Sequence, residues 1–469
     1  MKYMPDTPCV PAISRSGRGR NGLKVLVAIA LAAFSAIGET KAQQLAFPGA
    51  EGFGKTATGG RGGAIVPVTS LGDSGPGTLR ACIERSGPRS CVFRISGTIR
   101  LKSSLIVNKA ASKVSILGQT APGGGILLTI DQPNTEKRHT PFVIKNAADV
   151  VVRHVRVRPR FPSTMRNVDG FTVENSSRVY LDHVSSSWAT DENFNAHSTT
   201  TDLTVANSIF AEGLNKHSKC ALLGSDPKGP QNISFIKNAC VSNTDRNPDN
   251  NHYAGSCVEI VNNVFYNAGS EWGEVFSQFP GGTPVAYVGN YFKAGPSTND
   301  LSYAINWNEA ASVAEPRIYE TGNVTWSPPG KSIVAVAPDT QRYMVNAPSC
   351  ALSTAQLGSA EAAYGQVNLT AGAFPRDAVD VRVIGEIGAL GSKGSGKLVN
   401  APGTLPVVAD GQPYKDGDGD GMADSAEARF KADSTTSDAW IDGDGNGWSN
   451  FDDFMNWLSG ERIAGRYPG

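Results

Sequence analysis

The chain has 469 residues, of which 40% are hydrophobic, 18% are charged and 52 are glycine. This composition excludes a chain that is disordered throughout, and it favours many short strands joined by turns over long charged helices. The formal net charge is zero, and no helix-turn-helix pattern, zinc-finger spacing or basic run indicates a nucleic-acid partner.

The first 42 residues have the pattern of an export signal. A basic segment that ends at Lys24 precedes an apolar run over 25–38 and a small-residue site at 40–42. The apolar run is shorter than the roughly 20 residues that a membrane helix needs. We therefore expect a signal peptide over 1–42 and a secreted protein with no membrane partner.

Six cysteines follow this segment, and in an oxidising compartment they can pair. Cys82 and Cys91 lie close together across a turn-like SGPRS, which predicts one disulfide between them. Six cysteines allow fifteen connectivities, so the sequence leaves the remaining pairings open. The unassigned cysteines are Cys220, Cys240, Cys257 and Cys350.

Short apolar runs with the same shape recur in the middle of the chain at intervals of 24 to 31 residues. A period of this length, with β-branched residues and an Asn-containing turn in each repeat, is typical of a solenoid. We expect an all-β fold, a right-handed parallel β-helix over 43–390, with a β-sandwich as the alternative. The polar residues that align after the apolar triplets are His154, His183, Asn207, Asn238, Asn263 and Asn290.

Four charged residues follow one another at about one repeat each. Asp169, Asp191, Lys219 and Arg246 are separated by 22, 28 and 27 residues. In a β-helix their side chains can rise on one face at about 4.8 Å per rung. Such a column has acids at one end and bases at the other, which predicts a site for an anion bridged by a metal ion. The alternative is that Asp191 and Glu192 are solvated loop acids and that Lys219 is a surface charge.

Several longer motifs resemble the pectate lyases of polysaccharide lyase family 1. They lie between residues 46 and 387 and include AFPGAEGFGKTATGGRGG, VTSLGDSGPGTLRACI, ILGQTAPGGGI, DHVSSSWATDENF, HSKCALLGSD, RNP and RDAVDVRVIGEI. The resemblance implies a parallel β-helix that cleaves polygalacturonate or pectin by β-elimination with Ca²⁺.

The resemblance also implies roles for individual residues. Arg246 of RNP would remove the C5 proton, and Lys219 would bind a uronate carboxylate. Asp169, Asp191 and Asn195 would hold calcium, and Glu192 could replace a carboxylate that many members have where this chain has Asn. Arginine is normally protonated, so the alternative is that Arg246 acts as an electrophile and another group is the base.

Arginines alternate with valines in VRHVRVRPR, which places Arg156, Arg158 and Arg160 on one face of a strand. This face either binds the polyuronate, with Arg160 as the substrate-binding residue, or is solvated.

The C-terminal part has a different composition. A Gly/Ser/Pro-rich stretch over 391–415 predicts a linker or a wrapping segment, and 416–469 contains 12 acidic and 4 basic residues. Two copies of the twelve-residue calcium loop lie there, which resembles an EF-hand-like or dockerin-like module. The module either recruits a protein partner or braces the C-terminus. The expected calcium ligands are Asp416, Asp418, Asp420, Asp424 and Glu427 in the first loop, and Asp442, Asp444, Asn446, Asn450 and Asp453 in the second.

The sequence therefore predicts a secreted, monomeric, calcium-dependent pectate lyase. The alternatives are a pectin lyase that acts on methylated chains and a β-helix that binds polysaccharide without cleaving it.

Overall fold

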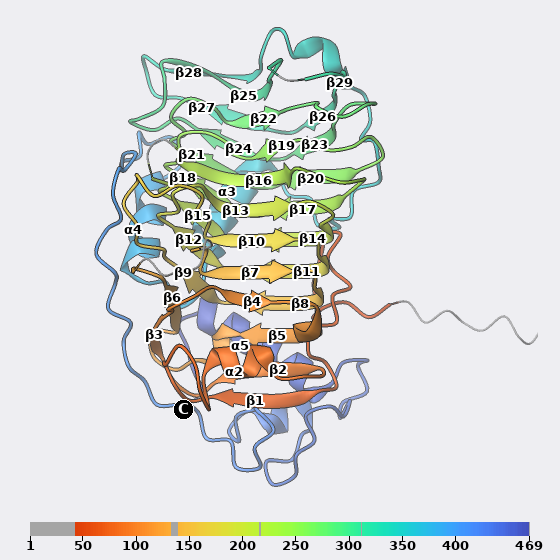
Figure 1. The fold of residues 1–469 in the computed structure, drawn as a ribbon, viewed down its shortest axis with the longest axis vertical. Helices are drawn as coiled ribbons and strands as arrows, with labels where there is room; N and C mark the ends of the chain where they lie inside the picture. The colour runs from red at the N-terminus through yellow and green to blue at the C-terminus, as the bar shows by residue number, and fades with distance from the viewer. Residues whose placement is uncertain (1–42, 133–138, 215–216, 311, 469) are drawn as a thin grey trace, which may run out of the picture. The chain divides into compact units, whose positions relative to one another are not determined.

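The structure, a computed structural model, describes residues 43–132, 139–214, 217–310 and 312–468. The expected signal peptide over 1–42 lies outside the described residues. Gln44–Gly469 cluster into one compact unit. In that unit the strands form three parallel sheets. After the first strand, each sheet takes every third strand of the chain, so that each full coil contributes one strand to each sheet (Figure 1). The predicted parallel β-helix is therefore confirmed.

The strands of each sheet follow one another in chain order. The first sheet contains β1 (Ala64–Val68), β2 (Arg89–Phe93), β5 (Val114–Leu117), β8 (Ala148–Arg153), β11 (Ser177–Asp182), β14 (Thr201–Ala206), β17 (Asn232–Ile236), β20 (Cys257–Val261), β23 (Pro284–Val288), β26 (Arg317–Thr321) and β29 (Met344–Val345). The second sheet contains β4 (Leu105–Val107), β7 (Phe142–Lys145), β10 (Phe171–Glu174), β13 (Glu192–His197), β16 (Lys219–Ser225), β19 (Asp249–Asn250), β22 (Gly273–Val275), β25 (Leu301–Trp307) and β28 (Ser332–Val336). The third sheet contains β3 (Gly97–Arg100), β6 (Ile126–Thr129), β9 (Val155–Val157), β12 (Ser185–Ser187), β15 (Ile209–Ala211), β18 (Ala239–Val241), β21 (Val264–Tyr266), β24 (Tyr291–Lys293) and β27 (Val324–Trp326).

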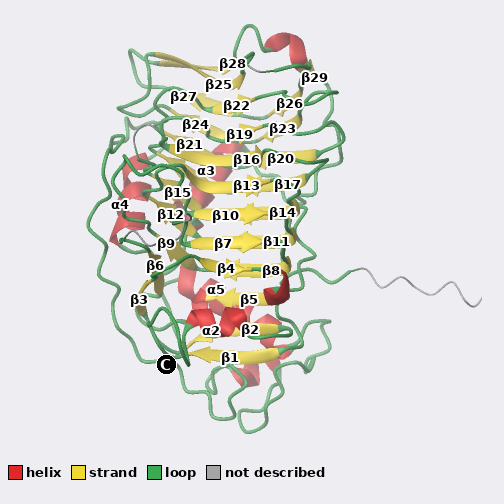
Figure 2. Cartoon of the chain, in the orientation of Figure 1, coloured by secondary structure: helices red, strands yellow, loops and turns green. Residues whose placement is uncertain are grey.

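The described helices are few: the three longest follow the last strand of the β-helix, and most of the short ones lie in connections between its strands (Figure 2). The α-helices are α2 (Leu79–Glu84), α3 (Ala360–Thr370), α4 (Ala378–Ile387) and α5 (Asn450–Ile463), and the 3₁₀ helices are η2 (Lys109–Ala111), η3 (Gly118–Thr120), η4 (Gln341–Tyr343) and η5 (Glu427–Phe430). None of the described helices is both long and apolar enough to span a bilayer.

The core is a stack of equivalent apolar side chains from successive coils. Val150, Val179, Leu203, Ile233 and Val258 pair from strand to strand in the first sheet, and all five are buried. Each side chain therefore packs on the same position one coil away, which gives β-branched and aliphatic residues a continuous interior.

At the bend after the first sheet, one position forms hydrogen bonds between coils and the position before it has left-handed backbone. Asn263 N–H donates to Asn290 Oδ1 at 2.9 Å, and Asn238 N–H donates to Asn263 Oδ1 at the same distance. The left-handed backbone belongs to the preceding position, as at Asn207 and Lys237. The register pairs Ala206 with Ile236, so the expected alignment of Asn207 with Asn238 is wrong by one residue.

The segment over 391–415 runs along the coils as a wrapping segment. Leu398 N–H donates to Ser297 Oγ at 3.2 Å, close to β24, and Ala409 O accepts from Gly124 N–H at 2.8 Å, close to β6. The chain thereby returns to the first coils, where α5 packs on apolar residues of β2 and β5.

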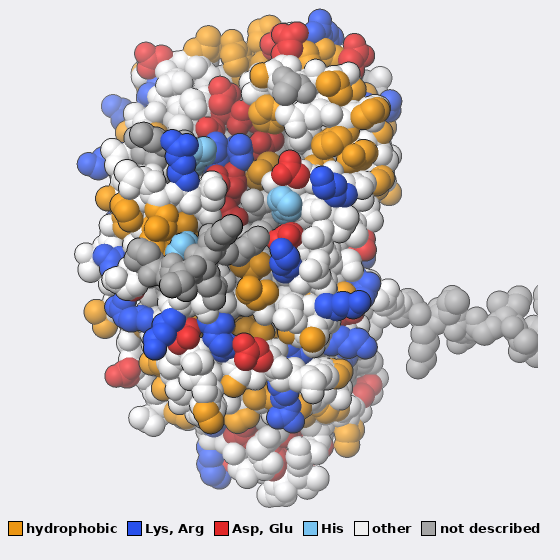
Figure 3. Space-filling view, viewed as in Figure 1, with side chains coloured by type: hydrophobic (Ala, Val, Ile, Leu, Met, Phe, Trp, Pro, Cys, Tyr) orange, Lys and Arg blue, Asp and Glu red, His pale blue; other side chains and the backbone are white. Residues whose placement is uncertain are grey.

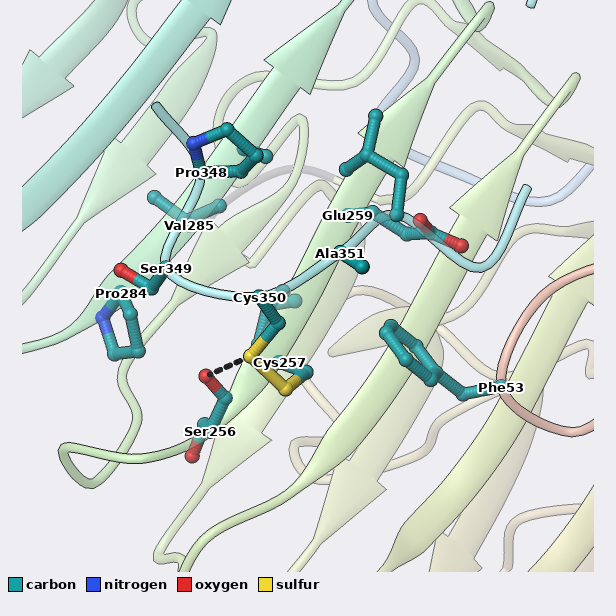
Figure 4. A pocket seen from close by; sticks show the side chains of 13 residues that line it. Phe53, Ser256, Cys257, Glu259, Pro284, Val285, Pro348, Ser349, Cys350 and Ala351 are labelled. Carbon is teal, nitrogen blue, oxygen red and sulfur yellow. Dashed lines mark hydrogen bonds between the residues drawn. A yellow bond between two sulfur atoms is a disulfide. The ribbon is translucent and has the colours of Figure 1, made fainter. Parts of the chain in front are cut away.

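Three disulfides fix the described chain. Cys82 bonds to Cys91 as predicted, and Cys220 bonds to Cys240. Cys257 bonds to Cys350 and fastens the segment after β29 across the first sheet, beside a small pocket (Figure 4). Glu259 in this pocket accepts hydrogen bonds from Ser234 and Thr354, so its carboxylate serves the packing of that segment.

Candidate active site

The second sheet carries the four charged residues that the spacing brings together. Asp169 lies two residues before β10, Asp191 lies directly before β13, Lys219 begins β16, and Arg246 lies three residues before β19. These four strands are consecutive in the sheet. The four side chains therefore lie at one end of neighbouring strands, about 4.8 Å apart per coil.

Three acids form a close group at this sheet. Carboxylate oxygens of Asp169, Asp191 and Glu192 lie within 4.8 Å of one another. Thr172 Oγ1 donates to Asp169 Oδ2 at 2.6 Å, and Asn195 Nδ2 lies 3.5 Å from the same oxygen. Burial and the neighbouring Asp191 raise the pKa of Asp169 to about 6. Burial, Asp169 and Asp191 raise the pKa of Glu192 well above its usual range.

This group suits a hard divalent cation. Asn195 Oδ1 is buried and has no hydrogen-bond partner among the described residues. A buried oxygen without a donor is costly, as are three carboxylates held together without a compensating charge. Calcium takes carboxylate and amide oxygens as ligands, so the donor set of Asp169, Asp191, Glu192 and Asn195 fits the ion that the sequence predicts.

Two cations flank the acids on the next coils. Arg246 Nη1 forms an ion pair with Glu192 Oε1, and Arg246 Nε lies 3.4 Å from Asp249 Oδ2. Burial opposes the charge of Arg246, but Glu192 and Asp249 outweigh it and raise its pKa. Lys219 Nζ lies 2.6 Å from Asp245 Oδ1. Both cations are therefore held by carboxylates in this structure.

Several further groups, which were not predicted from the sequence, lie in this cleft. His217 Nδ1 lies 3.7 Å from Asp191 Oδ1. Asp249 and Glu274 occupy paired positions of β19 and β22, and Glu274 Oε2 accepts from the backbone N–H of Arg246 at 3.2 Å. Burial and Glu274 raise the pKa of Asp249 to about 8, and burial together with Asp245 raises the pKa of Glu274 to about 7. His217 and Asp249 are part of the sequence motifs HSKC and RNPD and could have been recognised from them, whereas no motif surrounds Glu274.

Two adjoining clefts follow the sheet and share Asp191 and Asn195. Figure 3 looks onto this sheet and shows acidic side chains gathered in a hollow, with basic side chains and histidines near its edge. One cleft is lined by Asp191, Glu192, Asn195, His217, Leu222, Gly224, Ser225, Asp226, Arg246, Asp249, Asn251, Phe276 and Gln278. The other is lined by Thr140, Asn167, Asp169, Thr172, Glu174, Asp191, Asn195 and His197.

The structure does not bring Arg160 into this group. It follows β9 in the third sheet, where its N–H donates to Ile130 O at 3.0 Å, and it lines neither of the two clefts described above. Arg156 and Arg158 are fully buried and pair with acids at the start of α4. The expectation that these two arginines bind a polyuronate or face solvent is therefore wrong, because α4 covers them.

The predicted calcium ligands of the C-terminal loops lie apart from the two clefts. Asp416, Asp418 and Asp420 bring carboxylate oxygens within 4.8 Å of one another. Asp424 and Glu427 follow in the same loop, and Glu427 begins η5. The second predicted loop contains Asp442, Asp444, Asn446, Asn450 and Asp453, and its last residues form the first turn of α5.

The fold and the clefts define a class: a parallel β-helix protein with acids and bases in a row across successive coils. The crystal structure of Jun a 1, the major allergen from cedar pollen, is similar to this fold with a TM-score of 0.52, at 19% identity over 69% of this chain and 92% of that chain. A solved structure described as "Structural insights into substrate specificity and the anti beta-elimination mechanism of pectate lyase" is similar to this fold with a TM-score of 0.50. The identity is 12%, over 71% of this chain and 98% of that chain.

Sequence relatives define the family. "Probable pectate lyase C" of Neosartorya fischeri is 33% identical over 422 residues, which cover 88% of this chain and 92% of that protein. "Probable pectate lyase C" of Emericella nidulans is 32% identical over 437 residues, which cover 90% of this chain and 94% of that protein. No family model matches the chain. The chain belongs to the pectate lyase family and is an enzyme of the polysaccharide lyase class.

Proposed function

We propose that the protein is a secreted, monomeric pectate lyase that cleaves polygalacturonate by calcium-assisted β-elimination. The observation that carries the proposal is the group of Asp169, Asp191 and Glu192 at the two clefts, with Arg246 paired to Glu192 in one of them and Lys219 next to Glu192 on the neighbouring strand. A uronate chain along these clefts would meet carboxylates that need a cation and cations that fit a sugar acid.

Each residue has one task in this reaction. Lys219 binds a uronate carboxylate as a point charge. Arg246 takes the C5 proton, the electrons form the C4–C5 double bond, and the C4–O bond breaks with the proton for the leaving oxygen coming from solvent. Asp169, Asp191, Asn195 and Glu192 would hold calcium, which would supply charge stabilisation for the carboxylate next to C5. Arg246 can accept this proton only as the neutral guanidine, so it must first release its own proton to solvent and lose its partner Glu192, whose carboxylate favours the protonated form.

We also propose that both C-terminal loops are calcium loops of an EF-hand-like or dockerin-like module. The support is the placement of acids at positions 1, 3, 5, 9 and 12 of the first loop and at positions 1, 3 and 12 of the second. The three disulfides support export to an oxidising compartment.

One assay tests the main proposal. The purified chain is incubated with polygalacturonate or with highly methylated pectin, in calcium or in chelator, while the ultraviolet absorbance of the new double bond is followed. We expect a signal on polygalacturonate that chelator abolishes. A chelator-resistant signal on methylated pectin would instead identify a pectin lyase, and binding of the polymer without any signal would identify a non-catalytic β-helix.

A further inference from the structure

Equivalent backbone N–H groups donate to equivalent side chains in the two C-terminal loops, but the loops differ in which carboxylate oxygens lack a hydrogen-bond donor. In the first loop Asp416 Oδ1 accepts from Gly419 N–H at 2.9 Å, and Asp424 Oδ1 accepts from Gly417 N–H at 2.7 Å. In the second loop the equivalent acceptors are Asp442 Oδ1, at 2.8 Å from Gly445 N, and Asn450 Oδ1, at 3.0 Å from Gly443 N. Such bonds shape a loop and do not by themselves indicate a ligand.

The first loop contains buried carboxylate oxygens without donors. Glu427 has 0% exposure, and neither of its carboxylate oxygens has a hydrogen-bond partner among the described residues. Asp418 Oδ2 and Asp420 Oδ2 are buried and equally without a partner in that part of the chain. An unpaired buried carboxylate is destabilising, and burial together with Asp420 raises the pKa of Glu427 to about 7. The four oxygens therefore point to a cation that is chelated by oxygen.

A further acid comes from the segment between the loops. Asp438 Oδ2 accepts from Asp433 N–H at 3.1 Å, whereas Asp438 Oδ1 is buried and has no partner among the described residues. The segment lies against the first loop, because a Cβ added at Gly417 would be 3.6 Å from Ser434 O. The charge of Asp438 also contributes to the raised pKa values of Asp420 and Glu427. The twelve-residue motif does not include Asp438.

In the second loop an amide satisfies the corresponding carboxylates. Asn446 Nδ2 donates to Asp444 Oδ2 at 3.2 Å and to Asp453 Oδ2 at 2.8 Å. Asp444 and Asn446 are exposed, so water can satisfy their remaining atoms. The amide lies between two oxygens that would face a cation, so the carboxylates of this loop are compensated without calcium, unlike those of the first loop.

The first loop is also joined to α5 and to the first coils. Tyr414 Oη donates to Gly421 O at 2.7 Å, and a Cβ added at Gly421 would lie 3.0 Å from Phe451 Cε2 of α5. Arg94 Nη1, directly after β2, lies 3.8 Å from Asp416 Oδ2. Any opening of the loop would therefore disturb both contacts.

The helix α5 in turn contacts the outer side of the coils. Ser459 Oγ lies 2.7 Å from His154 Nε2, and Arg462 Nη2 donates to Gly123 O at 2.9 Å. Asp452 forms an ion pair with Arg61 at 2.8 Å. Without a cation, repulsion among the acids of the first loop opposes the docking of this helix.

We propose that the two loops are unequal: the first binds its calcium ion with Asp438 as an additional ligand, and this ion holds α5 on the first coils, whereas calcium in the second loop contributes little to the docking of α5. The inference rests on the proposed calcium binding of the first loop. It does not depend on lyase activity, so the two can fail separately.

Amide hydrogen exchange of α5 in the full chain tests this inference, with Ca²⁺ as the added ligand and chelator as the reference. The wild type is compared with Glu427→Gln and Asp438→Asn in the first loop, with the matched Asp453→Asn in the second loop, and with Asp191→Asn in the cleft. At calcium one hundred times the Kd, binding to the closed state alone slows exchange of α5 amides about hundredfold.

We expect this protection in the wild type, in Asp453→Asn and in Asp191→Asn. We expect Glu427→Gln to lose the protection of α5. Asp438→Asn should require at least about tenfold more calcium for the same protection, which corresponds to about 1.4 kcal/mol in binding free energy. If Glu427→Gln does not fold, the half-buried Asp438 still provides the test. Calcium-independent exchange of α5 in the wild type, an unchanged Asp438→Asn, or loss of protection in Asp453→Asn would each overturn the proposal.

Discussion

Arg246 and Glu192 lie 54 positions apart in the chain and form an ion pair across two coils of the β-helix. The same carboxylate belongs to the acidic group with Asp169 and Asp191. Glu192 thus faces both the expected cation and the expected base. A cation that engages Glu192 would weaken its hold on Arg246, which links metal binding to the availability of the guanidinium.

Replacement of Arg246 tests its role in proton transfer. Arg246→Ala should lower kcat on polygalacturonate by about 10²–10⁴-fold, the range that a positioned acid or base contributes, while the circular dichroism of the fold stays unchanged. Arg160→Ala is the matched control, because Arg160 lines neither of the two clefts. Normal turnover by Arg246→Ala would remove it as the base and as an electrophile.

Asp191 should control how much calcium the cleft needs. Asp191 lines both clefts and belongs to the three-acid group. Asp191→Ala should raise the calcium concentration for half-maximal activity at least about tenfold, because one carboxylate ligand is lost. Asp226 lines the same cleft but is 79% exposed and pairs with His197 at 3.5 Å, so Asp226→Ala should leave the calcium requirement unchanged. Equal shifts in the two variants would contradict the assigned ligand role of Asp191.

The sequence allowed much of the coil architecture to be predicted, because a solenoid repeats its local pattern. The spacing of Asp169, Asp191, Lys219 and Arg246 by about one repeat each was enough to place them on consecutive strands. The one-residue error at the asparagine bend arose because left-handed backbone and the asparagine ladder occupy adjacent positions, and both favour Asn.

Contacts between distant segments could not be predicted in the same way. Arg156 in β9 and Arg158 directly after it resemble a solvated face in the sequence VRHVRVRPR, but both pair with Asp380 of α4, more than 200 positions away. Glu274 joins the cleft through the pairing of β19 with β22, and no motif around it marks a site. Asp438 likewise lies outside the calcium-loop motif, although its position beside the first loop depends on how the C-terminal segment folds.

The buried ion pairs beneath α4 should be important for stability. Arg158 Nη2 lies 2.7 Å from Asp380 Oδ1, and both side chains have 0% exposure. Asp380→Ala should lower the free energy of unfolding by about 3–5 kcal/mol, because it leaves buried cations without their partner. Glu361→Ala on the exposed side of α3 should change it by less than about 0.5 kcal/mol. Urea unfolding checks both values, and a loss below about 1 kcal/mol for Asp380→Ala would show that Asp377 alone compensates Arg158.

Asp249 should make the metal-free protein less stable as the pH rises. Its pKa is about 8 in the folded chain, raised by burial and Glu274 from an ordinary value of 3.8. Between about pH 4 and pH 8 the folded state keeps a proton that the unfolded state has lost, so the stability falls with increasing pH by up to about 1.4 kcal/mol per pH unit from this group. Asp249→Asn resembles the protonated acid at every pH and should flatten this decline.

The measurement is the urea midpoint at several pH values in chelator, so that no metal competes for the acids. Other carboxyls with raised pKa values, Glu274 among them, contribute a slope of the same sign, and the difference between wild type and Asp249→Asn isolates the one group. Asp300, whose side chain is 92% exposed, provides the control, and Asp300→Asn should leave the slope unchanged. Parallel pH profiles for wild type and Asp249→Asn would mean that Asp249 stays ionised in the folded cleft, held there by Arg246.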